Sequence, residues 1–136
     1  MRKVKSLILL FLVAAFAVTT VNATAIPSLQ SDIQPRYVGV YRATSELTIS
    51  SSGGAKVHTL LEIYPNYTAK GTATLYCDSC TYVESWDSSG AGIIEVQGTH
   101  YVASGHNYYV TLSATIYDSN GRFVDTVDKD SLVRGY

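Results

Sequence analysis

Apolar and polar residues alternate over most of the chain after residue 36, and the clearest alternation lies within Ser104–Val127. Even positions from 108 to 116 are apolar or aromatic, and odd positions from 109 to 117 are Tyr, Thr or Ser. A period of two is typical of a β-strand with one buried face. The turn formers Asp-Ser-Asn-Gly at 118–121 end this strand, and the chain returns over 122–129. The pattern predicts a β-hairpin.

The turn of this hairpin allows two registers. A two-residue Asn-Gly turn would pair Ile116 with Asp125, which is a poor core pair. A type I turn from Asp118 with a bulge at Gly121 makes a three-residue loop and pairs Ile116 with Val124. We expect the second register, which requires a positive φ at Gly121 that glycine adopts at little cost.

The same alternation predicts further strands, separated by Gly, Pro, Asn, Asp and Ser. They are expected at 37–42, 45–50, 55–64, 67–77, 81–86 and 93–102. Asp-Ser-Ser-Gly at 87–90 is expected to end the strand at 81–86, and Gly98 leaves open whether 93–102 is one strand or two. Seven to eight short strands without helical spacing indicate an all-β fold, a single antiparallel β-sandwich or a small barrel.

The N-terminal segment has the features of a secretory signal peptide. Residues 1–5 carry three basic side chains, residues 6–18 are almost wholly apolar, and Ala-Thr-Ala at 23–25 is a small-x-small cleavage pattern. We therefore expect a cleaved signal peptide at 1–25, a flexible lead-in at 26–36 and one β-sandwich domain at 37–136. A retained membrane anchor is the alternative, but the apolar run is short for a bilayer span. Cleavage after Ala23 is the alternative site.

Charge restricts the partners of the processed chain. Residues 1–25 hold three of the ten basic residues and none of the eleven acidic ones, so removing them leaves seven basic residues and a formal net charge of −4. An acidic chain without a basic cluster is a poor partner for nucleic acid or for anionic lipid. We expect a secreted, extracellular protein that does not bind a membrane after processing.

Residues 102–110 (VASGHNYYV) place a glycine-containing corner just before Tyr-x-Val. This arrangement resembles the tyrosine corner of immunoglobulin-like and fibronectin type III sandwiches. Tyr108 lies on the apolar face and is a better candidate for the corner than Tyr109. The antibody-type Cys…Trp…Cys pattern is missing, so a true immunoglobulin domain is not implied.

Three segments carry a wider resemblance: RYVGVYRATSELTISSSGGAKV, Trp86–Gly92 and SGHNYYVTLSATIYDSNGRFVDTV. Over Arg36–Asp130 the chain resembles a group of small, uncharacterised secreted proteins of Gram-positive bacteria with immunoglobulin-like or fibronectin III-like sandwiches. The resemblance implies the fold and secretion, and it carries no activity.

Cys77 and Cys80 form a C-x-x-C spacing. A thioredoxin-like redox motif needs a helix after the first cysteine, and a strand pattern follows here. Structural zinc usually takes four ligands, and no histidine stands in ligand spacing to this pair. We expect a local disulfide that closes the turn between two strands, since oxidising surroundings favour disulfides.

Catalytic motifs are not found in the sequence. It has no G-x-S-x-G elbow, no H-E-x-x-H and no glycine-rich phosphate loop. His58 is expected on a solvated strand face, and His100 and His106 in loops around the corner. We expect neither catalysis nor a cofactor or metal.

The chain has eleven tyrosines, and this enrichment is the one feature of its composition that points to a function. Tyr109 and Tyr117 lie on the polar face of their strand with Thr111 and Thr115 between them, and we take these four as a candidate binding face. Tyrosine suits contact with sugars and proteins, although it also stabilises sheets through cross-strand pairs. The sequence therefore predicts a non-catalytic module that binds an unidentified protein or glycan, or is an extracellular structural part. The alternative is a secreted antimicrobial or toxin-like effector.

Overall fold

The computed structural model describes residues 37–136, so the predicted signal peptide and lead-in lie outside the described residues. The strands are β1 (Val40–Ile49), β2 (Gly54–Ile63), β3 (Thr68–Cys77), β4 (Thr81–Ala91), β5 (Ile93–Tyr101), β6 (Asn107–Tyr117), β7 (Phe123–Asp130) and β8 (Arg134–Gly135). Between residues 37 and 136, no helix is long and apolar enough to cross a membrane.

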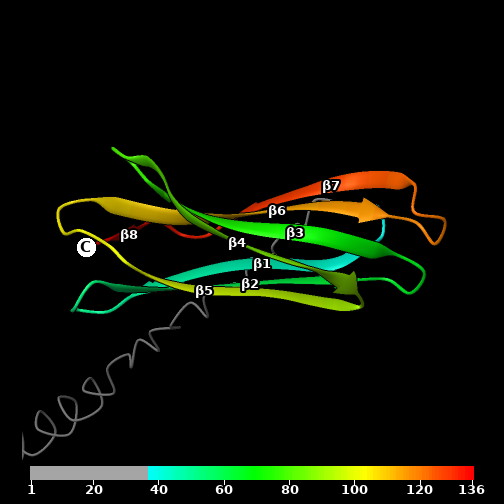
Figure 1. Cartoon of the computed structure of the whole chain (residues 1–136), viewed down its shortest axis with the longest axis horizontal. Coiled ribbons are helices and arrows are strands. Elements are labelled where there is room, and N and C mark those ends of the chain that lie inside the picture. The colour runs from blue at the N-terminus through cyan, green and yellow to red at the C-terminus, as the bar shows by residue number, and fades with distance from the viewer. Residues whose placement is uncertain (1–36) are drawn as a thin grey trace, which may run out of the picture. The chain divides into compact units, whose positions relative to one another are not determined.

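The strands form two antiparallel sheets that lie in two layers (Figure 1). One sheet has the order β1-β2-β5, and the other has the order β4-β3-β6-β7, with the short β8 also paired to β6. The predicted antiparallel β-sandwich is therefore confirmed. In constant-type immunoglobulin domains the fourth strand joins the sheet of the first, second and fifth. Here β4 pairs with β3 through a hairpin and joins the other sheet.

The hydrophobic core lies between the layers, as the alternation predicts. Its fully or nearly buried side chains come from β1, β2, β3, β5, β6 and β7: Ala43, Leu47, Ala55, Val57, Leu61, Ile63, Ala69, Ala73, Leu75, Cys77, Ile94, Val96, Tyr108, Val110, Leu112, Ala114, Ile116 and Val127. The one buried polar residue among those described is Thr59, whose hydroxyl donates to the Val96 carbonyl at 3.4 Å. Burying these apolar side chains provides the main driving force for folding.

Two strand boundaries differ from the prediction. The strands expected at 37–42 and 45–50 are one strand, β1, with a bulge between Val40 and Arg42. Ala43 and Thr44, between them, are not turn formers, and both pair with β2. Residues 87–90 also do not end β4, because they pair with β3 along the sheet edge. The turn falls instead at Gly92, which has a φ of +75°.

β5 is a single strand through Gly98. The glycine is explained by Trp86 of β4, because a Cβ at position 98 would overlap the fused edge of the indole and lie 2.6 Å from its Nε1. Trp86 is partly buried and packs against the core. Gly98 therefore makes room for a ring that covers the side of the sandwich between β4 and β5.

The β6–β7 turn has the predicted type but not the predicted register. The Gly121 amide donates to the Asp118 carbonyl at 3.0 Å, and Gly121 has a φ of +74°. Tyr117 pairs with Phe123, as that turn requires, but the register shifts between Ile116 and Tyr117, so Ile116 pairs with Asp125 rather than Val124. Val124 and Val127 are three residues apart, and a regular strand would turn one of them outward. The bulge lets both pack against the core.

The tyrosine corner at the β5–β6 connection is present. Tyr108 is 2% exposed, and its hydroxyl donates to the Ala103 carbonyl at 2.8 Å. Tyr109 points to the opposite face, as its place in the alternation predicts. The hydrogen bond fixes the path of the chain as it passes from one sheet to the other.

Candidate functional site

The outer face of the five-stranded sheet carries all four residues of the candidate binding face. Tyr109, Thr111, Thr115 and Tyr117 alternate along β6 with its buried residues, and each is partly exposed. β6 is an inner strand of its sheet, with β3 on one side and β7 and β8 on the other. The four residues therefore lie on an inner strand of the polar face, with the two tyrosines toward its ends.

β3 supplies the matching row on this face. Thr74 lies opposite Thr111, and Lys70 lies opposite Thr115. The Lys70 ammonium is 5.9 Å from the centre of the Tyr117 ring, within range of a cation–π contact. The ring of Tyr117 is therefore partly engaged within the protein.

Aspartates at the two edges of the sheet accept hydrogen bonds from the hydroxyls between them. Thr111 donates to Asp130 at 2.7 Å, and Ser113 donates to Asp128 at 2.6 Å, both across the β6–β7 pair. On the other edge, Thr72 of β3 donates to Asp87 of β4 at 2.5 Å. We call these three pairs the hydroxyl–carboxylate pairs. A hydroxyl that donates keeps its own lone pairs, so the face presents mainly hydrogen-bond acceptors.

Tyrosine rings gather at one end of the same face. Tyr76 and Tyr109 are cross-strand neighbours with ring centroids 5.3 Å apart and planes within 21° of parallel. Tyr82 of β4 lies opposite Tyr76 and is 57% exposed. The hydroxyl–carboxylate pairs thus lie between a group of three tyrosines and Tyr117.

A hollow open to solvent lies between β3 and β4 and is lined by Lys70, Gly71, Thr72, Asp87, Ser88 and Ser89. The hollow is lined in part by the Thr72–Asp87 pair, so the face has a shallow depression at its β4 edge. A face of this shape fits a flat or extended ligand better than a compact one.

The sequence indicated only part of this site. The alternation along β6 indicated that its four candidate residues share one face. The aspartates of the hydroxyl–carboxylate pairs come from β4 and β7. The composition of residues 87–90 favours a turn at Asp87, and the hairpin turn alone favours a register of β7 that differs by one residue from the observed one. The hydroxyl–carboxylate pairs follow from strand pairing, which the linear pattern does not contain.

A second cluster lies at the turn between β3 and β4. Cys77 and Cys80 form a disulfide, as predicted, with Cα atoms 5.0 Å apart. The Asp78 Oδ1 atom is 3.9 Å from the Cys77 sulfur. A disulfide sulfur carries no hydrogen, so this approach is a contact rather than a hydrogen bond.

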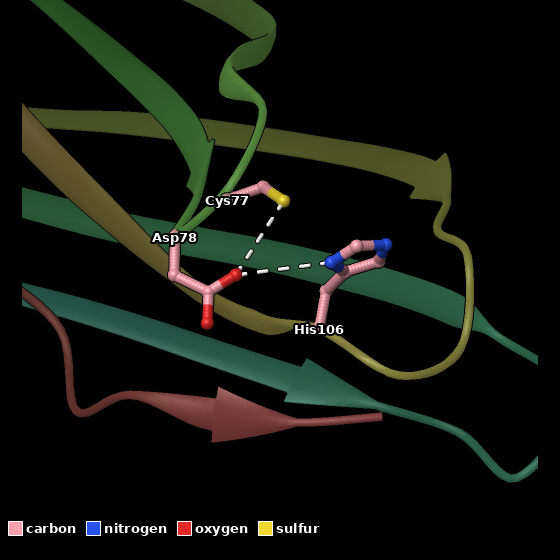
Figure 2. A group of neighbouring side chains, drawn as sticks. All are labelled: Cys77, Asp78 and His106. Atoms are coloured by element: carbon pink, nitrogen blue, oxygen red, sulfur yellow. Dashed lines mark hydrogen bonds and ion pairs between the residues drawn. The ribbon is translucent and has the colours of Figure 1, made fainter.

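His106 reaches this turn from the β5–β6 connection (Figure 2). Its Nδ1 is 2.7 Å from the Ser79 hydroxyl and 3.8 Å from Asp78 Oδ1. The Asn107 side-chain amide donates to the other Asp78 oxygen at 3.0 Å, and this bond is the main reason that the pKa of Asp78 is lowered. The Asp78 side chain is 47% exposed, so the cluster is open to solvent.

The serine, histidine and aspartate of this cluster do not have the geometry of a hydrolytic triad. In a triad the serine and the carboxylate contact opposite nitrogens of the imidazole. Here Ser79 and Asp78 both face Nδ1 of His106. This arrangement does not orient the histidine as a base toward the serine.

The other two histidines lie elsewhere on the domain. His58, on the outer face of the three-stranded sheet, is 2.5 Å from Glu95, and this hydrogen bond is the main cause of a lowered pKa at Glu95. His100 of β5 is 3.8 Å from Glu84 of β4. Each histidine thus pairs with one carboxylate, at three separate places.

No protein-family model matches the chain, and no curated protein matches its sequence.

Proposed function

We propose that this protein is a secreted, non-catalytic binding module whose ligand is an uncharged glycan. The observation that carries the proposal is the outer face of the five-stranded sheet, where hydroxyl–carboxylate pairs lie between tyrosine rings. Acceptors of this kind pair with sugar hydroxyls, which donate. Tyrosine offers a flat apolar surface with a polar tip, and its ordering costs little conformational entropy.

Charge favours an uncharged ligand over an anionic one. The three pairs place Asp87, Asp128 and Asp130 on the face, where the ammonium group of Lys70 lies over Tyr117. An anionic polysaccharide or nucleic acid would be repelled by this excess of carboxylates. The same excess is consistent with the acidic net charge of the processed chain.

The chemistry of the face also favours a glycan over a protein. Protein interfaces usually centre on large apolar or aromatic anchors, with charged residues depleted at the core. The middle of this face holds Thr72, Thr111 and Ser113 with their aspartates, and its aromatic rings lie toward the ends. A hydroxyl-rich ligand matches that arrangement better.

A glycan array followed by calorimetry on the best ligand tests the proposal. Replacing Tyr109 and Tyr117 with serine should weaken binding at least about tenfold, which corresponds to about 1.4 kcal/mol. The fold should persist, because neither ring is in the buried core. The control is the same double change at Tyr41 and Tyr101, which are 66% and 80% exposed and lie in the other sheet.

Two results would contradict the proposal. Binding that survives the Tyr109→Ser/Tyr117→Ser change but fails in the control variant would place the site elsewhere. An array without any bound glycan, together with a protein partner captured through the same tyrosines, would replace the sugar by a protein ligand.

Secretion is part of the proposal and rests on the signal-peptide pattern of residues 1–25 and on the resemblance to secreted proteins. We expect the secreted protein to begin at Ile26. Intact mass and N-terminal sequencing of the culture supernatant test this, and a protein that keeps residues 1–25 in the membrane would refute it.

A further inference from the structure

The turn between β3 and β4 brings four potential metal ligands to one place. Sγ of Cys77, a carboxylate oxygen of Asp78 and a ring nitrogen of His106 all lie within 4.8 Å of one another. Figure 2 shows the three groups converging from the turn and from the β5–β6 connection. Sγ of Cys80 is bonded to that of Cys77 and belongs to the same place.

We propose that the reduced form of this turn binds one Zn²⁺ ion through Cys77, Cys80, His106 and Asp78. Two thiolates, an imidazole and a carboxylate are all established zinc ligands, and four of them complete a tetrahedral site. The two-residue spacer between the cysteines is the spacing found in structural zinc sites. Metal binding at this turn is independent of glycan binding on the outer face.

In the disulfide form the sulfurs are not ligands, because the thiolate is the species that binds metal. Two equivalents of a thiol reductant must first break the S–S bond. The disulfide takes up two electrons and two protons to give two thiols, and the reductant leaves as its own disulfide. Zn²⁺ then displaces one proton from each thiol.

The rearrangement needed is local. With Zn–S bonds of about 2.3 Å, tetrahedral geometry sets the two sulfurs roughly 3.8 Å apart, so they must separate once the bond is broken. His106 must exchange its contact with the Ser79 hydroxyl for the metal. The Asp78 backbone amide donates to the Asn107 carbonyl at 3.0 Å, which ties the turn to the histidine's own segment. The ligands are therefore held close together without the disulfide.

Titration of the reduced protein with Co²⁺ and Zn²⁺ under anaerobic conditions tests the site. Reduced wild-type protein should bind one equivalent, with the visible bands and the sulfur-to-cobalt charge transfer of a tetrahedral thiolate site. The disulfide form should bind at least about 100-fold more weakly, because it offers no thiolate. Competition by Zn²⁺ should bleach the cobalt bands.

Variants separate this site from binding by the two cysteines alone. His106→Ala and Asp78→Asn should each weaken binding by at least about tenfold in the reduced protein. His100→Ala is the matched control, since His100 pairs with Glu84 at another place, and it should leave the affinity unchanged. Fluorescence of the single tryptophan reports whether each reduced variant is folded.

Three outcomes would overturn the proposal: no stoichiometric metal in folded, reduced protein; an affinity that His106→Ala does not change; or loss of the native tryptophan emission on reduction of the wild type. The last would mean that the turn does not keep its ligands together without the disulfide.

Discussion

Replacing Gly98 with alanine should destabilise the sandwich, although alanine ordinarily destabilises a strand less than glycine does. Gly98 lies on the inward side of β5, directly beneath the indole of Trp86. The added Cβ would overlap the ring atoms Cδ2 and Cε2 and lie 2.6 Å from Nε1. Because Trp86 also packs against the core, the ring has to move away from its other contacts.

The size of the effect follows from two opposing terms. Carbon atoms pack best about 3.5–4.0 Å apart, so the indole must shift by more than about 1 Å or β5 must bend. Overpacking of this kind costs about 1–3 kcal/mol. Gly98 does not have a positive φ, so alanine also gains about 0.4–1 kcal/mol by restricting the unfolded chain. We expect a net loss of about 1–2 kcal/mol in the free energy of unfolding.

Urea denaturation followed by far-UV circular dichroism measures this loss, and the Trp86→Ala background tests its cause. Without the indole, the same Gly98→Ala change should become neutral or stabilise by up to about 1 kcal/mol. The matched control is Gly90→Ala on the neighbouring β4, where an added Cβ would meet its nearest neighbour, in Ile94, at 4.0 Å. Equal destabilisation by Gly98→Ala in both backgrounds would refute the packing argument.

Three further predictions concern other contacts. Tyr108→Phe should lower the free energy of unfolding by about 1 kcal/mol, since it removes the corner hydrogen bond, and urea denaturation that shows no change would contradict this. The carboxyl of Glu95 should titrate below its ordinary pKa in the folded protein, because His58 hydrogen-bonds to it. Because the pKa is lowered in the folded protein, the carboxylate's contribution to folding stability is present above the unfolded-state pKa and is lost as the pH falls through the folded-state pKa. His58→Ala should move the pKa of Glu95 upward, as measured by NMR. Cys77→Ser with Cys80→Ser should leave a folded protein, weakened by no more than about 2 kcal/mol in thermal unfolding, because the closed loop is short.

Local alternation predicted the faces of the strands well. In β2 the inward set at positions 57, 59, 61 and 63 is buried, and in β3 the small residues Ala69, Gly71 and Ala73 face the core. The reason is that a side chain's face depends only on its position along its own strand. Tyr108 could be assigned to the corner for the same reason.

Features that depend on a partner strand were predicted less well. Asp87–Gly90 has the composition of a turn, yet pairing with β3 keeps it extended. The β7 bulge arises because two valines three residues apart both pack inward, and this need outweighed the register favoured by the turn alone. In both cases, contacts with a partner strand or with the core outweighed the local conformational preference.

The pairing of β3 with β6 links the two candidate sites. One uninterrupted register joins these strands from Thr68 opposite Tyr117 to Cys77 opposite Tyr108. It places Tyr76 beside Tyr109 on the outer face, and the next residue pair beyond its end is Asp78 with Asn107. A slip by one residue would turn one strand's polar set inward and also separate the cysteine turn from His106. Both sites therefore depend on one strand pairing, whose partner residues are 31 (Cys77 and Tyr108) to 49 (Thr68 and Tyr117) positions apart. Inward burial of the apolar residues of each strand fixes the register of this pairing.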